Sequence, residues 1–591
     1  MSARFRLLTS ISLFPLFNKA QLHTILDRKS CRSYVLAMIH DGPSRDTSAL
    51  GDQQPGLVPG VIHPSNAVSP SAHGPRIFRI SRMKRSTYPA RTTLAALFWM
   101  LIAAIGCRHS PAPSSTRTLT LAVRADVTGF YPNPPTTSES YTIDVNRNIY
   151  DSLLQIDTRH RVEPALAERW ENPDERTCLF FLRPGVRFSN GKPLTAADVA
   201  ASFDALRMRG WISWDVLQAI ESVRAVDDVR VEIKTRTPYL ALLPRLTWGF
   251  ILPAEAVGKT PVPFIGSGPY RLANWTPGKE FILEKNPYYR GPGPAFSRVR
   301  YVVVPDQDER IGMVLRGEAE VADNITPDTI NLLSRMKNVT LMTRPALRVF
   351  FLCMRMDDPV FSIKQVREAI DLAMDRHELI RRVFKGGALP ASQIVSSDIF
   401  GYNPDIQESP PDRQKARKLL AAAGFPHGFV VRLDGPFNRY LNDRQVLDEV
   451  ARQLGEVGIS VTVNAIDKRD FFQLIDSGKS PFHLLGWACE TGDASHVLDA
   501  VFHSPAIGGL GSYNCMGIHD ARLDQMIDES NRSTNNKERA GYLKEAIARV
   551  TELRLAIPLI VPIDAIVVSR SIVWDPPVNL ALRPAEMRPA Q

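Results

Sequence analysis

Cysteine is scarce in this chain, with six residues among 591. The five that follow the first hundred residues are scattered singly, at Cys107, Cys178, Cys353, Cys489 and Cys515. A structural zinc site would require closely spaced ligand pairs, so this spacing argues against one. Cys489 and Cys515 fall in one region of the chain, which leaves a disulfide between them open in an oxidising compartment.

The chain also lacks an excess of positive charge once its first 106 residues are set aside. Thirteen Lys and Arg against four Asp and Glu give residues 1–106 a net charge of +9, so about +1 of the total of +10 remains for residues 107–591. No basic run and no basic stripe interleaved with aromatic residues follows in the later part. We therefore expect no nucleic-acid partner.

No apolar run reaches the roughly 20 residues that a membrane-spanning helix requires. The apolar stretch 94–105 is shorter, follows a basic segment that begins at Met83, and ends in Gly106-Cys107. A basic start, a short apolar middle and small residues at the end are typical of a secretory signal peptide, here 83–106. Because the four residues Ala104-Ile105-Gly106-Cys107 resemble a bacterial lipobox, we expect Cys107 to carry a lipid.

Residues 1–82 show no sustained hydrophobic period and contain scattered Pro, Gly, Ser and His. This composition is typical of an unstructured segment. The simplest hypothesis is that translation begins at Met83 and that residues 1–82 are upstream sequence read in frame, and the alternative is a genuine N-terminal extension. The Pro-, Ser- and Thr-rich residues 107–116 predict a tether between a membrane surface and a folded domain.

The segment "TCLFFLRPGVRFSNGKPLTAADVAASFDAL" is the clearest local unit of the later chain. Residues 177–182 predict a strand, and residues 189–192 predict a turn. Thr195 and Asp198 have the spacing of a capping box at a helix start. The apolar face of that helix falls on Val199, Phe203 and Leu206. Taken alone, the pattern indicates only a mixture of helices and strands.

Several segments resemble the family 5 extracellular solute-binding proteins, the peptide/nickel class of ABC-transporter receptors. "LAERWENPDERTCLFFLRPGVRFSNGKPLTAADV" looks like the hallmark segment of the family, and "GSGPYRLANWTPGKEFILEKNPYYRG" looks like its second block. Further blocks follow in the same order, at residues 366–388, 416–425, 523–530 and 556–562. The resemblance covers nearly all of residues 117–580.

The resemblance implies an α/β fold of the bilobed periplasmic-binding-protein type, in its large three-domain form with a hinge between the lobes. The first lobe is then expected at 117–347, with an inserted domain near 158–260. The second lobe is expected at 348–556, and residues 557–591 return to the first lobe and form the C-terminal tail. The ligand of such proteins is enclosed between the lobes, so closure around it is expected.

The implied function is that of a substrate-binding receptor of an ABC importer, which captures short peptides and delivers them to a membrane permease. Its partners are then the permease and ATPase subunits, and the membrane through the lipid on Cys107. The receptor is expected to be a monomer in the periplasm or at the cell surface. No cofactor, no bound metal and no catalytic residue is implied.

The segment "GWACETGDASHVL" resembles the part of peptide-binding members that supplies a tryptophan and a carboxylate to the ligand site. Trp487 matches the tryptophan, Glu490 falls where an aspartate pairs with the α-ammonium group of the peptide, and Asp493 fits a second acidic position. A buried ammonium group requires a buried anion, which supports this assignment. Arg355 departs from the family pattern, which commonly has asparagine there.

Other ligands and other classes of protein stay open at this stage. Nickel chelates, haem and oligosaccharides are also bound by the family, and Trp487 would suit a sugar ring. A sensor or a hydrolase could reuse the fold, although no G-x-S-x-G nucleophile elbow is present around Ser267. His483, His496 and His503 lie close in sequence, but their spacing fits no single helical face for a metal site.

Overall fold

The structure is a computed structural model, and it describes residues 117–590 except 132–139, 160, 210–216, 218, 260–262, 438, 507 and 508. All described residues belong to a single structural unit. The expected extension 1–82, the signal peptide 83–106, the lipidated Cys107 and the tether 107–116 lie outside the described residues. None of the helices in the described part combines the length and the apolar character that crossing a membrane requires.

Twelve strands of the described residues form one mixed sheet. Ten of them follow in the order β16 (Ile459–Asp467), β15 (Phe429–Phe437), β17 (Phe482–Ala488), β13 (Arg348–Met354), β18 (Ala556–Ser569), β11 (Val321–Ala322), β1 (Thr118–Val123), β10 (Arg298–Val303), β9 (Glu280–Lys285) and β8 (Tyr270–Thr276). The remaining two, β12 (Val339–Pro345) and β14 (Ala388–Pro390), pair with β18. The expected mixture of helices and strands is therefore present.

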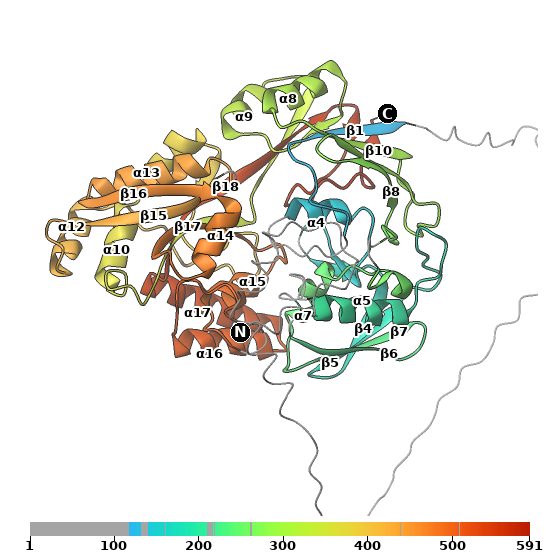
Figure 1. Ribbon diagram of the computed structural model, residues 1–591, viewed down its shortest axis with the longest axis horizontal. Coiled ribbons are helices and arrows are strands. Elements are labelled where there is room, and N and C mark those ends of the chain that lie inside the picture. The colour runs from blue at the N-terminus through green and yellow to red at the C-terminus, as the bar shows by residue number, and fades with distance from the viewer. Residues whose placement is uncertain are drawn as a thin grey trace, which may run out of the picture. The chain divides into compact units, whose positions relative to one another are not determined.

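Strand β18 passes from one half of the sheet to the other (Figure 1). Its residues 556–560 pair with β13, and its residues 563–569 pair with β12. Beside this crossing the chain crosses a second time, between the end of β12 and the start of β13, where the Ala346 amide donates to the Pro562 carbonyl at 2.8 Å. Two short adjacent segments thus connect the strands of 118–345 with those of 348–560.

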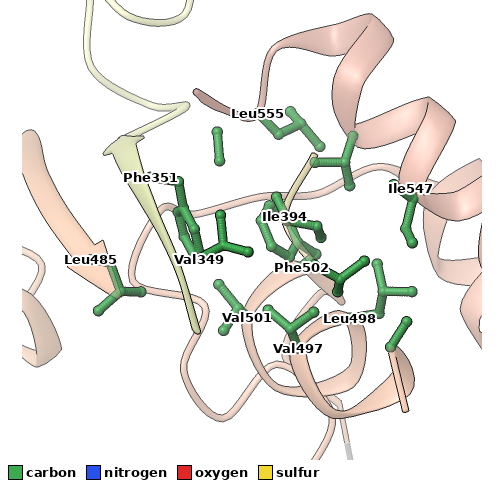
Figure 2. Close-up of a cluster of buried hydrophobic side chains, with 14 of the residues drawn as sticks. Val349, Phe351, Ile394, Leu485, Val497, Leu498, Val501, Phe502, Ile547 and Leu555 are labelled. Carbon is green, nitrogen blue, oxygen red and sulfur yellow. The ribbon is translucent and has the colours of Figure 1, made fainter. Parts of the chain in front are cut away.

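Strand β13 is buried on both of its faces. Val349, Phe351 and Cys353 belong to one apolar cluster, and the alternating residues 350, 352 and 354 belong to another. This double burial explains why the strand reads as a continuous apolar run without polar alternation. Figure 2 shows the first cluster, in which Phe351 packs with residues such as Phe502.

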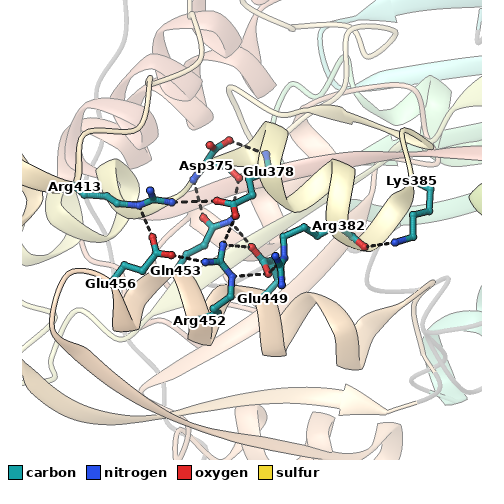
Figure 3. A network of polar contacts seen from close by, with 9 residues as sticks. All are labelled: Asp375, Glu378, Arg382, Lys385, Arg413, Glu449, Arg452, Gln453 and Glu456. Carbon is teal, nitrogen blue, oxygen red and sulfur yellow. Dashed lines mark hydrogen bonds and ion pairs between the residues drawn. The ribbon is translucent and has the colours of Figure 1, made fainter.

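Helices cover both faces of this half of the sheet. They are α10 (Lys364–Ala373), α11 (Arg376–Leu379), α12 (Arg413–Ala422), α13 (Asp443–Gly455), α14 (Lys468–Asp476), α15 (Ser495–Val497), α16 (Ala521–Arg532) and α17 (Asn536–Leu553), with π-helical turns at Ile380–Phe384 and Leu498–Phe502. An ion-pair network joins α11, α12 and α13 (Figure 3). Within it Arg452 contacts Glu378, Glu449 and Glu456. Most of these side chains are partly exposed, so each pair adds little stability and the network mainly fixes helix positions.

A separate antiparallel sheet of four strands lies within residues 167–235 of the described chain. Its order is β4 (Ala167–Asp174), β5 (Thr177–Leu182), β7 (Arg230–Thr235) and β6 (Ile220–Ala225), and it packs with α5 (Ala196–Arg209). Strand β5 coincides with the strand predicted at 177–182. Asp198 accepts hydrogen bonds from both the amide and the hydroxyl of Thr195, at 2.8 and 3.0 Å, so the capping-box contact from the Asp198 carboxylate back to the Thr195 amide is confirmed.

The half of the sheet that contains β1 and β10 packs against helices and an aromatic core. Its further elements are α4 (Ser140–Asn146), α8 (Gln307–Arg316), α9 (Pro327–Leu333), the pair β19 (Ile572–Val573) and β20 (Arg588–Pro589), and a 3-10 turn at Ala254–Ala256. Helix α7 (Leu242–Arg245) and the hairpin of β2 (Leu154–Ile156) and β3 (Val162–Pro164) pack instead with the four-stranded sheet, and the 3-10 turn at Leu246–Trp248 contacts both cores. The second family block has a structural role here. A Cβ on Gly266 would lie 2.0 Å from the Ile149 carbonyl oxygen, and Asn286 donates to the Gly268 carbonyl at 2.9 Å. Ser267 is buried between these glycines.

Candidate ligand-binding site

Two adjoining cavities lie beside the crossing strands. The large cavity has a volume of about 390 Å³ and is lined from α4, from the segment after β11, from β18 and from residues 579–582. The small cavity has a volume of about 140 Å³ and is lined mainly from α14, β17 and residues 496–515. Five residues line both: Arg348, Arg439, Tyr440, Ala488 and Glu490. The two cavities therefore form one continuous candidate site.

Trp487 lies in the small cavity near the end of β17. Its indole ring meets the rings of His496 and Tyr513 edge to face, with centroids 5.5 and 5.4 Å apart. Its indole nitrogen is buried and has no hydrogen-bond partner among the described residues. These ring contacts hold the Trp487 side chain in place, and its indole N–H can donate a hydrogen bond to a ligand.

Glu490 follows β17 directly and lies where the two cavities meet. It is half-buried, and none of the described residues forms a hydrogen bond or an ion pair with its carboxylate. The place of this uncompensated carboxylate at the junction suits a cationic ligand group.

Three further carboxylates line the large cavity, Asp144 from α4, Asp323 after β11 and Asp564 from β18, and the charge of Glu490 acts on the first and the last of these. Burial, together with the nearby charge of Glu490, raises the pKa of Asp144 to about 7, while Arg147 and Arg583 oppose the shift. Asp564 is accessible from the cavity, but desolvation by the surrounding protein and the charge of Glu490 raise its pKa to about 6. The cavity therefore disfavours three negative charges at once, and a bound cation would relieve this repulsion.

Basic side chains line the same large cavity. They are Arg124, Arg348, Arg439 and Lys468. The guanidinium groups of Arg348 and Arg439 lie over the ring of Tyr440, at 5.8 and 5.3 Å from its centroid. Acidic and basic groups thus share one enclosed space, and this arrangement suits a ligand that carries both a cation and an anion.

Asp493 lies outside the lining of both cavities. It is buried and forms a bidentate ion pair with Arg539 of α17, at 2.5 and 2.9 Å, and it also accepts the Ser495 amide at 2.9 Å. Burial would raise the pKa of Asp493, but Arg539 and these hydrogen bonds outweigh it and hold the pKa below its usual value. The structure thus brings Trp487 and Glu490 to the candidate site and places Asp493 in an internal ion pair.

The histidines, the cysteines and Arg355, which were considered in the sequence, do not come together in one site. His483 contacts the thiol of Cys515 at 3.3 Å, and His503 lies between Asp524 and Asp528. No group of three His, Cys, Asp or Glu in the described part of the chain could hold a metal ion. Cys489 and Cys515 are both free thiols. Arg355 pairs with the neighbouring Asp357 and lines neither cavity.

We expect His483 to make the folded state sensitive to acid. Burial lowers the pKa of His483 to about 4, with Arg355 acting in the same direction and Asp434 opposing it. Below pH 6.5 the unfolded chain gains a proton at this histidine that the folded chain does not bind, so stability is lost as the pH falls from about 6.5 to about 4. At pH 4.5 this histidine is expected to lower the free energy of unfolding by on the order of 2 kcal/mol.

Urea unfolding of wild type and His483→Gln at pH 7.5 and pH 4.5 measures this contribution. The difference in unfolding free energy between the two pH values should be smaller in the variant by that amount. His519→Gln, at an exposed histidine, serves as the matched control. Equal pH dependence in wild type and His483→Gln would contradict the neutral buried histidine.

Comparisons with known proteins agree with one another. A sequence model of the bacterial extracellular solute-binding proteins, family 5 middle region, matches residues 161–509, more than half of the chain. The glutathione-binding protein GsiB of Escherichia coli K12 is 28% identical over 450 residues, which cover 73% of this chain and 86% of that protein.

Solved structures give the same result for the fold. The periplasmic binding protein DppA from Helicobacter pylori, in complex with the peptide STSA, is 21% identical, with a TM-score of 0.70 over 80% of this chain and 98% of that one. NikA from Brucella suis, in complex with Fe(III)-EDTA, is 22% identical, with a TM-score of 0.71 over 80% and 100%. The predicted bilobed fold of the periplasmic-binding-protein type is therefore confirmed.

Proposed function

Since the chain belongs to family 5 of the bacterial extracellular solute-binding proteins, and is thus a solute receptor as predicted, we propose that it captures short peptides for an ABC importer. The two cavities would hold the peptide, and a permease with its ATPase subunits would receive it. We propose further that the receptor acts as a monomer, outside the cytoplasm and without catalysis. Relatives described as glutathione-binding and as peptide-bound support this choice of ligand.

The observation that carries the proposal is the carboxylate of Glu490 at the junction of the cavities. It has no partner among the described residues, and it acts electrostatically on Asp144 and Asp564. The α-ammonium group of a peptide would supply the missing cation, and Arg348 and Arg439 would meet its carboxylate. A short peptide carries both charges at a separation that one enclosed site can span.

We propose that the lobes extend over 117–347 and 348–556, with residues 557–591 returning to the first lobe. The paired crossings near Ala346 and Pro562 would then form the hinge. Two adjacent segments that pass together between the halves of the sheet can absorb a rotation without unpacking either core. Asp144 and Glu490 belong to different lobes in this division, and they line the same cavity between them.

Addition of the tripeptide Ala-Ala-Ala is expected to stabilise the protein and to reduce its radius of gyration. A ligand that binds only the folded state stabilises it by RT ln(1 + [L]/Kd), about 2.7 kcal/mol at 100 times Kd. Calorimetry, thermal unfolding and small-angle scattering measure affinity, stability and closure on the same sample. The N-acetylated tripeptide is the control and should bind far more weakly. Failure of the free peptide to bind would contradict the proposal.

A metal chelate is the second candidate, because four basic side chains line the large cavity. Carboxylates of a chelator would pair with these residues in the way that the peptide carboxylate does in the favoured proposal. Mass spectrometry of the molecule that co-purifies with residues 117–590 separates the two. A peptide supports the favoured proposal, and a metal with a polycarboxylate supports the second candidate.

We propose that Cys107 anchors the receptor to a membrane, after cleavage of a signal peptide at 83–106. The support is the sequence pattern of a basic start, a short apolar run and a terminal cysteine. Cys107→Ser should abolish palmitate incorporation and release the protein from the membrane fraction. Cys178→Ser is the matched control and should leave both unchanged. Labelling that persists in Cys107→Ser would overturn the anchor.

A further inference from the structure

The small cavity differs in character from the large one. Its exposed lining is mainly apolar, and its aromatic and larger aliphatic walls include Trp248, Phe472, Ile475, Leu485, Trp487 and Tyr513. Three acidic and three basic side chains also line it, against four of each in the large cavity, whose exposed lining is about half polar. The candidate site therefore consists of a large polar space and a more apolar side chamber, which meet at Glu490.

The walls of the small cavity are fixed in place by contacts between aromatic rings. The Trp248 ring meets His496 edge to face at 5.9 Å, and His496 and Tyr513 meet Trp487 in the same way. Burial lowers the pKa of His496 to about 3, with Arg245 adding to the shift and Asp493 opposing it. This histidine is therefore uncharged at neutral pH, and the chain of rings forms a rigid wall.

The charges at the base of the small cavity are compensated within the protein. Asp499 pairs with Arg245, accepts a hydrogen bond from Asn531 at 2.9 Å, and accepts another from the Tyr239 hydroxyl at 3.2 Å. Asp476 also lines the cavity and is exposed, so water can compensate its charge. Unlike Glu490, these groups do not require a charged ligand group to compensate them.

The size of the small cavity matches one aromatic ring. Its volume is about 140 Å³, and an apolar protein cavity of about 150 Å³ binds benzene. We propose that the small cavity is a specificity pocket that receives one aromatic side chain of the ligand while the charged ends of the ligand occupy the large cavity. This inference rests on the proposed peptide function and adds the preferred class of side chain.

Calorimetry with four tripeptides tests the pocket: Ala-Ala-Ala and the three variants that carry a single Phe. At least one Phe peptide should bind about tenfold more tightly than Ala-Ala-Ala, because burial of a Phe side chain provides 1.5–3 kcal/mol or roughly a factor of 10–100. Equal affinity for all four peptides would overturn the specificity pocket and leave the peptide function intact. If none of the four binds, the proposed function fails, and the pocket fails with it.

A variant that fills the small cavity distinguishes binding of the Phe side chain in that cavity from non-specific apolar binding elsewhere on the protein. Ser512 lines the small cavity, and its side chain is exposed there. Ser512→Leu should remove the preference for Phe. Ser460→Leu, at an exposed serine of β16 outside both cavities, should retain the preference. A preference for Phe that survives in Ser512→Leu would overturn the assignment to this cavity.

Discussion

Replacement of Arg539 by Met is expected to lower the free energy of unfolding by about 3–5 kcal/mol, because it leaves the buried charge of Asp493 without its partner. The two terminal guanidinium nitrogens of Arg539, Nη1 and Nη2, donate to this carboxylate, and its Nε donates to the Ser530 carbonyl at 3.1 Å. The side chains are almost completely buried. Removal of one member of such a pair costs much more than the pair contributes to stability, because the remaining ion cannot be hydrated.

Urea unfolding monitored by circular dichroism measures this loss. The matched control is Arg444→Met, which removes an exposed ion pair with Asp448 and should cost at most about 1 kcal/mol. In the double variant Arg539→Met/Asp493→Leu the buried charge is gone as well, so much of the stability should return. A loss below about 1 kcal/mol in Arg539→Met would show that water reaches Asp493 and that the pair is not a structural element.

The structural role of Asp493 could not be predicted from its local sequence. Glu490 and Asp493 lie three residues apart in one acidic segment, and nothing in that segment separates a ligand-binding acid from a structural one. The separation depends on Arg539, which lies 46 residues further along the chain. Only the packing of α17 against this loop brings the arginine to Asp493 and leaves Glu490 without a partner among the described residues.

Local features were predictable because their causes are local. The strand at 177–182 follows from a run of apolar and β-branched residues, and the helix that follows it begins where Thr195 and Asp198 form a capping box. The second family block is also explained by short-range packing, since Gly266 must approach the backbone of Ile149 closely. Such signals need no knowledge of the tertiary fold.

Much of the charged lining of the large cavity could not be predicted in the same way. Asp144 comes from α4, Arg348 from the start of β13, and Asp564 from the middle of β18. These residues are hundreds of positions apart, and each looks like an ordinary surface charge in its local sequence. They meet because β18 pairs with strands from both halves of the sheet, a pairing that no local pattern specifies.

The affinity for a free peptide is expected to fall by about 2–5 kcal/mol in Glu490→Gln, the usual cost of removing one partner from a buried charge pair. The α-ammonium group would then remain desolvated without its anion. An N-acetylated peptide never makes this contact, so its weak affinity should change little. Calorimetry with Ala-Ala-Ala and its acetylated form, on wild type and variant, gives the four affinities required.

Asp564→Asn is the matched control, because Asp564 lines the same cavity from β18. It should cost less than Glu490→Gln if Glu490 is the direct partner of the ammonium group. A second readout comes from Asp144, whose raised pKa of about 7 depends in part on the charge of Glu490. In the ligand-free Glu490→Gln variant this pKa should fall, as an NMR titration can measure. Equal small losses for the free and the acetylated peptide would place Glu490 outside the ammonium site. The preference for a charged peptide terminus would then have to come from Asp144 or Asp564, and the variant with the larger loss would identify which.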